Sequence, residues 1–145
     1  MLTQGMMTSN SSEWETPQWL FDQLDTTFHF ALDVCATEQN AKCKNYYTIK
    51  TNGLAQNWYK GPNVANWMNP PYGREIADWV QKASYYTTVC LLPARTDTRW
   101  FHEFIYHKAY IEFIKGRLHF SNSESAAPFP SMIVVFNHQD FIPNL

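Results

Sequence analysis

The chain has 145 residues, of which 45% are hydrophobic and 17% are charged, and this balance is typical of a folded domain rather than a disordered chain. Its formal net charge of -2 argues against strong non-specific binding of nucleic acid by the whole surface. No apolar run approaches the roughly 18 residues of a membrane helix, and three cysteines without a C-x-x-C pair predict a reducing cytoplasm and no disulfide framework.

The chain begins with a polar stretch and then a helix. Residues 1–13 are expected to form a flexible tail, and residues 14–145 a single domain. Thr16 is placed to cap a short helix, Pro17 suits its first position, and residues 18–28 continue it. The apolar side of this helix is expected to consist of Trp19, Leu20, Phe21 and Leu24.

Two apolar runs in the first half predict strands. Residues 30–36 fit a buried strand with Asp33 near its C-terminal end. An irregular stretch with a turn at Asn52-Gly53 follows. A second strand is predicted over 64–68, and it is stopped by the sequence NPPYG, since proline fixes φ and removes a backbone donor.

The second half alternates helices and strands. Apolar residues at helical spacing predict a helix over 74–86. The remaining elements are expected to be strands over 87–92, 109–114 and 132–136, a helix over 98–107, and a long irregular connection over 116–130. The alternation of strand and helix predicts right-handed βαβ units on a largely parallel sheet.

Several polar groups follow the predicted strands directly. They are Asp33, the segment 69–72, Arg95 and Arg117. Ligands of such sheets bind beyond the carboxyl ends of the strands. These residues are therefore expected to meet at one edge of the sheet, where a ligand site would form.

The two arginines each have two interpretations. Arg95 could meet a phosphate or the carboxylate of a cofactor, or form a surface ion pair with Asp97, and Arg117 has the same ambiguity. Residues 60–119 carry a net charge of +3, which indicates either a modest basic face or a mixed solvated surface.

Histidine and tryptophan residues are the other candidates. His102 and His107 are five residues apart and miss the spacing of a helical metal pair, so no metal site is expected. Trp67 and Trp79 are expected in the core, whereas Trp58 lies in an irregular stretch and is expected to be the most open of the three.

The sequence NPPY has a structural and a chemical interpretation. A lone NPP is most simply a rigid turn. Alternatively, the side-chain carbonyl of Asn69 and the backbone carbonyl of Pro70 could accept two hydrogen bonds from one planar amino group. Acceptors placed off the ring plane would favour a more tetrahedral nitrogen and free its lone pair, while Tyr72 could lie flat on the ring.

NPPY after a strand resembles the catalytic motif of amino-group methyltransferases that use S-adenosylmethionine. Beyond this motif, the chain resembles the small phage-type DNA N-6-adenine methyltransferases, a Dam-like family. The resemblance runs from Trp14 to about Phe136 and is carried by WETPQWLFDQLDTTFHFALDVCAT, NGLAQNW, WMNPPYGREIADWVQKA, LLPARTDTRWFH, FIKGRLHF and APFPSMIVVF.

This resemblance implies a reduced Rossmann-like α/β fold, with a mostly parallel sheet and helices on both faces. It also implies methyl transfer to N6 of an extruded or single-stranded adenine in DNA, in the cytoplasm of a bacterial host cell. The implied cofactor contacts are Thr16, Pro17, Phe21, Asp33, Val34, Cys35, Ala36 and Asn69. The implied catalytic residues are Asn69, Pro70, Pro71 and Tyr72, and the implied substrate contacts are Tyr72, Arg95, Arg117 and Phe120.

The chain departs from the wider methyltransferase pattern in its cofactor motifs. The stretch DVCAT lacks the usual Gly-x-Gly, so the small Ala36 would have to allow close approach of the cofactor. No acid stands where the ribose hydroxyls are usually bound, and Asn52 is the candidate there. One strand–helix unit is missing, and 145 residues leave no room for a separate target-recognition domain.

Two alternatives to DNA adenine methylation remain at this point. The first is the same chemistry on another planar amine, such as an RNA adenine or a protein glutamine. The second is a non-catalytic DNA-binding or decoy module, which the glycine-free DVCAT stretch suggests.

Overall fold

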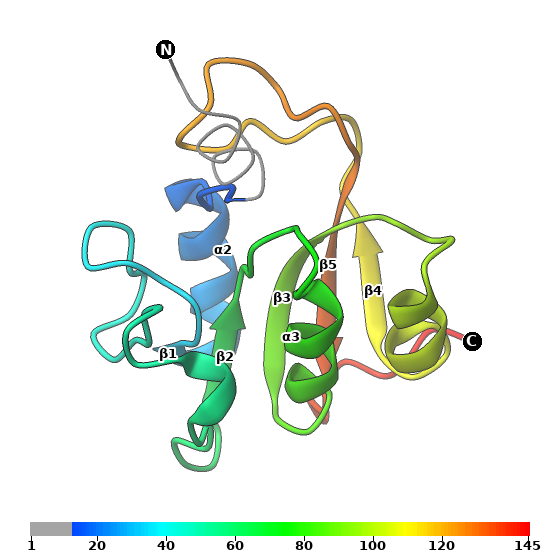
Figure 1. The fold of residues 1–145 in the computed structure, drawn as a ribbon. Coiled ribbons are helices and arrows are strands. Elements are labelled where there is room, and N and C mark those ends of the chain that lie inside the picture. The colour runs from blue at the N-terminus through cyan, green and yellow to red at the C-terminus, as the bar shows by residue number, and fades with distance from the viewer. Residues whose placement is uncertain (1–12) are drawn as a thin grey trace.

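The computed structural model describes residues 13–145, so all but the last residue of the tail expected over 1–13 lies outside the described residues. A five-stranded mixed sheet forms the centre (Figure 1). In chain order the elements are α2 (Gln18–Phe28), β1 (Phe30–Asp33), the 3-10 turn η1 (Gly53–Ala55), β2 (Ala65–Met68), α3 (Ile76–Ala83), β3 (Thr88–Pro93), the π-helical turn η2 (Phe101–Ile105), β4 (Tyr110–Phe113) and β5 (Ser131–Phe136).

The strand order is β1-β2-β3-β5-β4. β1, β2 and β3 pair in parallel, whereas β5 pairs antiparallel with both β3 and β4. β1 to β4 therefore run in one direction and β5 runs against them. This confirms the predicted α/β class and the common edge at which the carboxyl ends of β1 to β4 meet.

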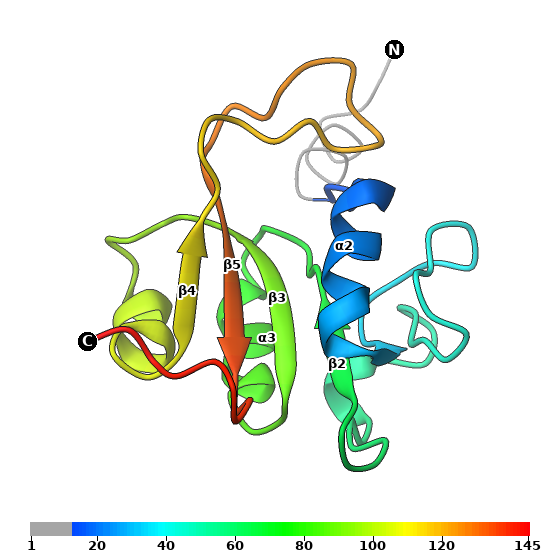
Figure 2. The same ribbon diagram turned by 180° about the vertical axis from the view of Figure 1, so that it is seen from behind.

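The two α-helices cover opposite faces of the sheet, as the front and back views show (Figures 1 and 2). α3 buries one apolar stripe, made by Ile76, Trp79, Val80 and Ala83 at the predicted helical spacing. α2 buries Leu20 and Phe21 but leaves Trp19 59% exposed. The placement of Trp19 on the apolar side was thus wrong, because the helix turns that position away from the sheet.

The core lies between these layers. Every residue of β2, β3 and β5 is buried, as continuous apolar runs in central strands require. Trp67 and Trp79 are buried as predicted. Trp58 is not open but wholly buried, because its ring stacks near Trp79 and its indole N–H donates to the carbonyl of Gly53 at 2.8 Å.

Several predicted elements are shorter than expected, α3 and β4 among them. The helix expected over 98–107 is shortened to residues 99–105, and most of it is the π-helical turn η2, in which the N–H of Tyr106 donates to the carbonyl of Phe101. His107 then takes a left-handed φ of 63° and turns the chain toward β4. The first strand ends at Asp33 rather than at residue 36, since Asp33 makes an isolated bridge with Tyr46 and the chain leaves the sheet.

The long connection between β4 and β5 is irregular as predicted, and it crosses the edge of the sheet toward the first described residues (Figure 1). Within the described part of the chain, no helix is both long and apolar enough to cross a membrane.

Candidate active site

A cavity of about 550 Å³ opens at the edge where β1 and β2 end. This volume lies within the usual range for small-molecule sites. Most of its lining comes from four segments: residues 13–16, which we call the strap; residues 33–42, which begin at the last residue of β1; residues 48–54; and residues 69–71, which follow β2. Trp67, Glu75, Trp79 and Asn122 complete the lining. The cavity therefore lies where the direction of the parallel strands predicts a ligand site.

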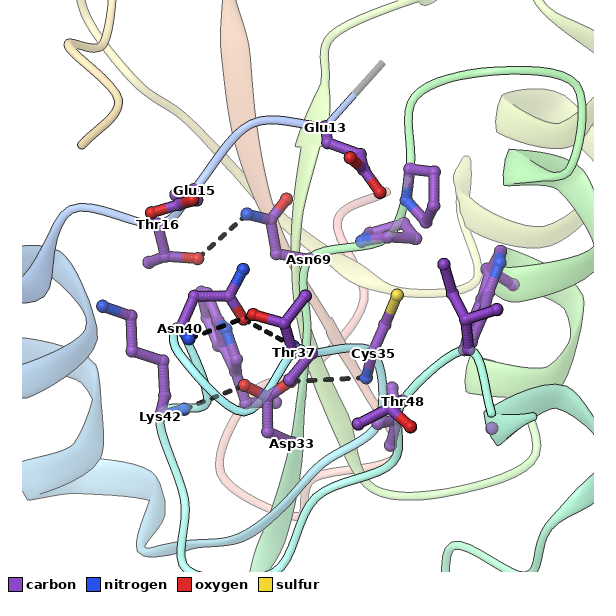
Figure 3. A pocket seen from close by; sticks show the side chains of 18 of the residues that line it. Glu13, Glu15, Thr16, Asp33, Cys35, Thr37, Asn40, Lys42, Thr48 and Asn69 are labelled. Atoms are coloured by element: carbon purple, nitrogen blue, oxygen red, sulfur yellow. Dashed lines mark hydrogen bonds between the residues drawn. The ribbon is translucent and has the colours of Figure 1, made fainter. Parts of the chain in front are cut away.

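The floor of the cavity contains a buried carboxyl group, that of Asp33. Its two oxygens accept hydrogen bonds from the backbone N–H groups of Cys35, at 3.3 Å, and Lys42, at 3.0 Å (Figure 3). These bonds favour the ionised form, but burial disfavours it more strongly and raises the pKa of Asp33 to about 6.

A close backbone contact joins the floor to the wall beside it. A Cβ atom on Gly53 would lie 2.3 Å from the carbonyl oxygen of Val34, so only glycine fits there. Asn52, the neighbouring residue, also lines the cavity and takes a left-handed φ of 54°. The wall of residues 52–54 is thereby pressed directly against the chain that follows β1.

The thiol of Cys35 points into the cavity (Figure 3). Burial, together with the nearby carboxylates of Asp33, Glu13 and Glu75, raises the pKa of Cys35 to about 12. The thiol is therefore neutral at physiological pH and contributes a small, weakly polar surface.

Asn69 directly follows β2, and both the nitrogen and the oxygen of its side-chain amide are hydrogen-bonded. Its amide nitrogen Nδ2 donates to the backbone carbonyl of Trp14 and to Thr16 Oγ1, the latter at 2.9 Å. Its amide oxygen Oδ1 accepts from the hydroxyl of Tyr72 at 2.8 Å. Figure 3 shows Asn69 facing Thr16 at the rim of the cavity.

Tyr72 is a buried residue rather than a wall of the cavity. Its ring is 4% exposed and makes edge contacts with Phe120 and Phe129. The hydroxyl also lies 3.0 Å from the carbonyl of Leu91, so its single proton is shared between two acceptors. In this structure neither face of the ring borders the cavity.

The strap is held down by the connection between β4 and β5. Asn122 accepts from the N–H of Glu15 at 2.9 Å and donates to the carbonyl of Glu13 at 3.0 Å. The N–H of Ser121 donates to the carbonyl of Glu15 at 3.0 Å. Residues more than 100 positions apart thus close one side of the cavity together.

The structure brings many of the predicted site residues together. Those that line the cavity are Thr16, Asp33, Val34, Cys35, Ala36, Asn69, Pro70 and Pro71. Outside the lining are Pro17, Phe21, Tyr72, Arg95, Arg117 and Phe120.

The residues outside the lining have other surroundings. Phe21 packs on Phe30 and Trp67, and Phe120 on Trp14. Arg95 forms no ion pair with Asp97 but donates from Nη2 to the backbone carbonyl of Tyr72 at 3.2 Å, and Arg117 is exposed.

The sequence interpretation missed several polar residues of the cavity. Thr37 and Asn40 hold a reciprocal turn, with the Thr37 N–H donating to Asn40 Oδ1 at 2.7 Å and the Asn40 N–H to Thr37 Oγ1 at 3.1 Å. The sequence ATEQN, residues 36–40, is typical of such a turn, so this pairing could have been predicted. Asn122 lies 53 positions beyond Asn69, and no local pattern links it to the site.

Comparisons with known proteins identify the family of this chain. The family model described as DNA N-6-adenine-methyltransferase (Dam) matches residues 5–140. A DNA N-6-adenine-methyltransferase of Haemophilus phage HP1 is 33% identical over 141 residues, which cover 88% of this chain and 80% of that protein. Another, from Escherichia phage T1, is 32% identical over 110 residues, which cover 72% of this chain and 45% of that protein. The chain belongs to the DNA N-6-adenine-methyltransferase (Dam) family.

Proposed function

We propose that this protein transfers a methyl group from S-adenosylmethionine to N6 of an extruded or single-stranded adenine in DNA. The observation that carries the proposal is the position of the Asn69 amide at the rim of a cavity of about 550 Å³. A methyl donor held in this cavity would place its reactive end beside the acceptors that grip the adenine amino group.

The residues of the cavity fit S-adenosylmethionine. This molecule combines positive charges, a carboxylate, ribose hydroxyls and a flat base. Asp33 offers a buried carboxylate to positive charge, and Thr37, Asn40 and Asn52 offer polar groups to hydroxyls. Ile49, which also lines the cavity, offers apolar surface to a base. Gly53 lies directly against the carbonyl of Val34, so the wall of residues 52–54 stays close to the chain that follows β1.

We infer that residues 14–145 form one reduced Rossmann-like methyltransferase domain. The support is the strand order β1-β2-β3-β5-β4, with β5 antiparallel, and the placement of α2 and α3 on opposite faces. The bridge between Asp33 and Tyr46 occupies the side of β1 where a further strand–helix unit would begin.

The chemistry needs positioning more than a strong base. When bound, S-adenosylmethionine would supply a methyl group on a sulfonium: the lone pair of N6 would form the new bond to carbon, and sulfur would keep both electrons of the broken carbon–sulfur bond. Asn69 Oδ1 and the Pro70 carbonyl would accept the two N–H bonds of N6 and direct its lone pair. Because an amide is a very weak base, the surplus proton leaves N6 to water rather than staying on Asn69.

Replacement of Asn69 tests the site directly. We expect Asn69→Ala to lower the rate of adenine methylation by about 100-fold or more, because a preorganised acceptor is lost. The affinity for S-adenosylmethionine, measured by calorimetry, should change little. Asn57→Ala is a matched control, since Asn57 is exposed and lies outside the cavity lining. An Asn69→Ala protein that keeps the full rate would contradict the assignment.

The acceptor is tested by competition. Labelled S-adenosylmethionine is incubated with DNA, RNA and glutamine-containing protein in one reaction, and the products are separated after digestion. The proposal predicts label in N6-methyladenine from DNA. Label mainly in RNA or in protein would overturn the choice of substrate, and absence of cofactor binding in calorimetry would favour a non-catalytic DNA-binding module.

A further inference from the structure

We propose that Thr16 is a positioning residue whose hydroxyl fixes the orientation of the Asn69 amide. This inference rests on the proposed function, because it concerns how the acceptor of that reaction is held. It gives Thr16 a role in the chemical step that is separate from any contact with the methyl donor.

The hydrogen bonds of Asn69 define the orientation of its amide. A primary amide has two N–H bonds. One of them meets the backbone carbonyl of Trp14 and the other meets Thr16 Oγ1 at 2.9 Å. A backbone carbonyl can only accept, so the nitrogen and not the oxygen of the amide must face the strap.

This orientation leaves the side chain able only to accept further hydrogen bonds. Oδ1 has two lone pairs, and the shared proton of the Tyr72 hydroxyl uses one of them at 2.8 Å. The second lone pair remains for the amino group of the target. A flipped amide would instead present N–H bonds to an amino group, and two donors would then oppose each other.

Thr16 has no competing structural task in the helix that follows. The sequence predicts it as the cap of α2, but Pro17 is the N-cap residue and the helix has no side-chain cap bond. Thr16 is only 4% exposed and lines the cavity. A buried hydroxyl that binds an amide rather than the helix backbone adds little to helix formation, but it restricts the rotation of Asn69.

Two groups bind the Asn69 amide nitrogen, the backbone carbonyl of Trp14 and the hydroxyl of Thr16. A side-chain substitution cannot remove the carbonyl, so Thr16 is the residue to replace. Thr16→Val keeps the shape and removes the acceptor, whereas Thr16→Ser keeps the hydroxyl and removes a methyl group. Thr26→Val is a matched control, since the Thr26 hydroxyl donates only to the nearby carbonyl of Gln23, at 2.8 Å, on the exposed side of α2.

The first measurement is the single-turnover rate at saturating cofactor and DNA, together with the cofactor Kd from calorimetry. We expect Thr16→Val to lower the rate about 10- to 100-fold, since small misplacements of a reacting group cost rates of this size. The Kd should stay within about twofold of the wild-type value. Thr16→Ser should recover most of the rate, and Thr26→Val should behave as wild type.

Three results would overturn the proposal. The first is an unchanged rate in Thr16→Val, and the second is an equal loss of rate in Thr16→Val and Thr16→Ser. The third is a loss of activity that is fully explained by a higher Kd for the cofactor. The last result would place Thr16 among the residues that hold the cofactor and not among those that position Asn69.

A second measurement is independent of activity. In protein labelled with ¹⁵N-asparagine, the side-chain amide signals of Asn69 are identified by their absence in Asn69→Ala. Thr16→Val should shift one of these two proton signals and speed its exchange with water, and Thr16→Ser should not. Unchanged signals in Thr16→Val would refute the positioning role. A wild-type protein without methylation activity but with this response would refute the proposed function instead.

Discussion

At the scale of single residues, Asp33 makes the stability of the fold depend on pH. Burial raises the pKa of its carboxyl group from 3.8 to about 6. Since the folded pKa lies above the unfolded one, the folded chain binds more protons between about pH 4 and pH 6. Ionised Asp33 therefore costs stability, and this cost appears as the pH rises through that window and stays constant above it.

Replacement of Asp33 by asparagine isolates this effect. We expect the free energy of unfolding of the wild type, minus that of Asp33→Asn, to fall by on the order of 3 kcal/mol between pH 3.5 and pH 7. Denaturant unfolding at several pH values measures both proteins under the same conditions. A difference that stays flat, or one that rises with pH, would show that burial does not dominate at this carboxyl group.

Single residues were predictable from the sequence where a local pattern determines their place. Asp33 ends β1 and Asn69 directly follows β2, and both line the cavity as strand direction implies. Tyr72 was expected to be free for a ring of the substrate, but its partners Phe120 and Phe129 come from a connection 48 or more positions away. Contacts of that range leave no periodicity in the sequence.

At the scale of elements, the strap and the connection between β4 and β5 act together. Asn122 bonds twice to the backbone of the strap, at 2.9 and 3.0 Å, and it also lines the cavity. The strap in turn holds Asn69 through Trp14 and Thr16. The position of the long connection is thereby transmitted to the end of β2.

Loss of the Asn122 side chain should weaken the attachment of the strap to the connection between β4 and β5. We expect Asn122→Ala to weaken the binding of S-adenosylmethionine about tenfold, as the loss of two modest hydrogen bonds to the strap implies. Its free energy of unfolding should change by less than about 1 kcal/mol, because Asn122 is exposed.

Ser123→Ala is the control for this experiment, since the Ser123 hydroxyl contacts only Ser125 within the same connection. Calorimetry of both variants with the same cofactor preparation gives the comparison. Equal affinities in Asn122→Ala and Ser123→Ala would mean that the strap is held by other contacts.

Element types were predictable from periodicity, but caps and short turns were not. The spacing of Ile76, Trp79 and Val80 predicts α3 well, since all three are buried on one side. The pattern around Phe101 and Ile105 is equally helical, yet the helix there covers only residues 99–105 and is mostly π-helical. Apolar spacing does not distinguish these cases when the chain must turn within a few residues to begin the next strand.

At the scale of the whole molecule, the direction of the strands produces the site. β1 to β4 run the same way, so their ends and the residues that follow them share one edge. This convergence was predictable from chain order. The insertion of β5 between β3 and β4 was not, because a long irregular connection does not determine which neighbour a strand will pair with.

The modest net charge also bears on how the molecule meets its substrate. A charge of -2 gives little general attraction to a polyanion. Arg117 is exposed on the connection that crosses the edge of the sheet, whereas Arg95 is engaged with the backbone of Tyr72. DNA binding is therefore expected to depend on a small number of contacts near the cavity and to leave most of the surface free.

The proposed activity, methylation of adenine in DNA through Asn69, can be tested in cells. The most direct measurement is the detection of methylated bases in the DNA of bacterial cells that lack their own adenine methyltransferase and express either the wild type or Asn69→Ala. We expect N6-methyladenine with the wild type and none with Asn69→Ala at equal protein levels. Methylated cytosine instead, or no methylated adenine from a folded wild-type protein that binds S-adenosylmethionine, would contradict it.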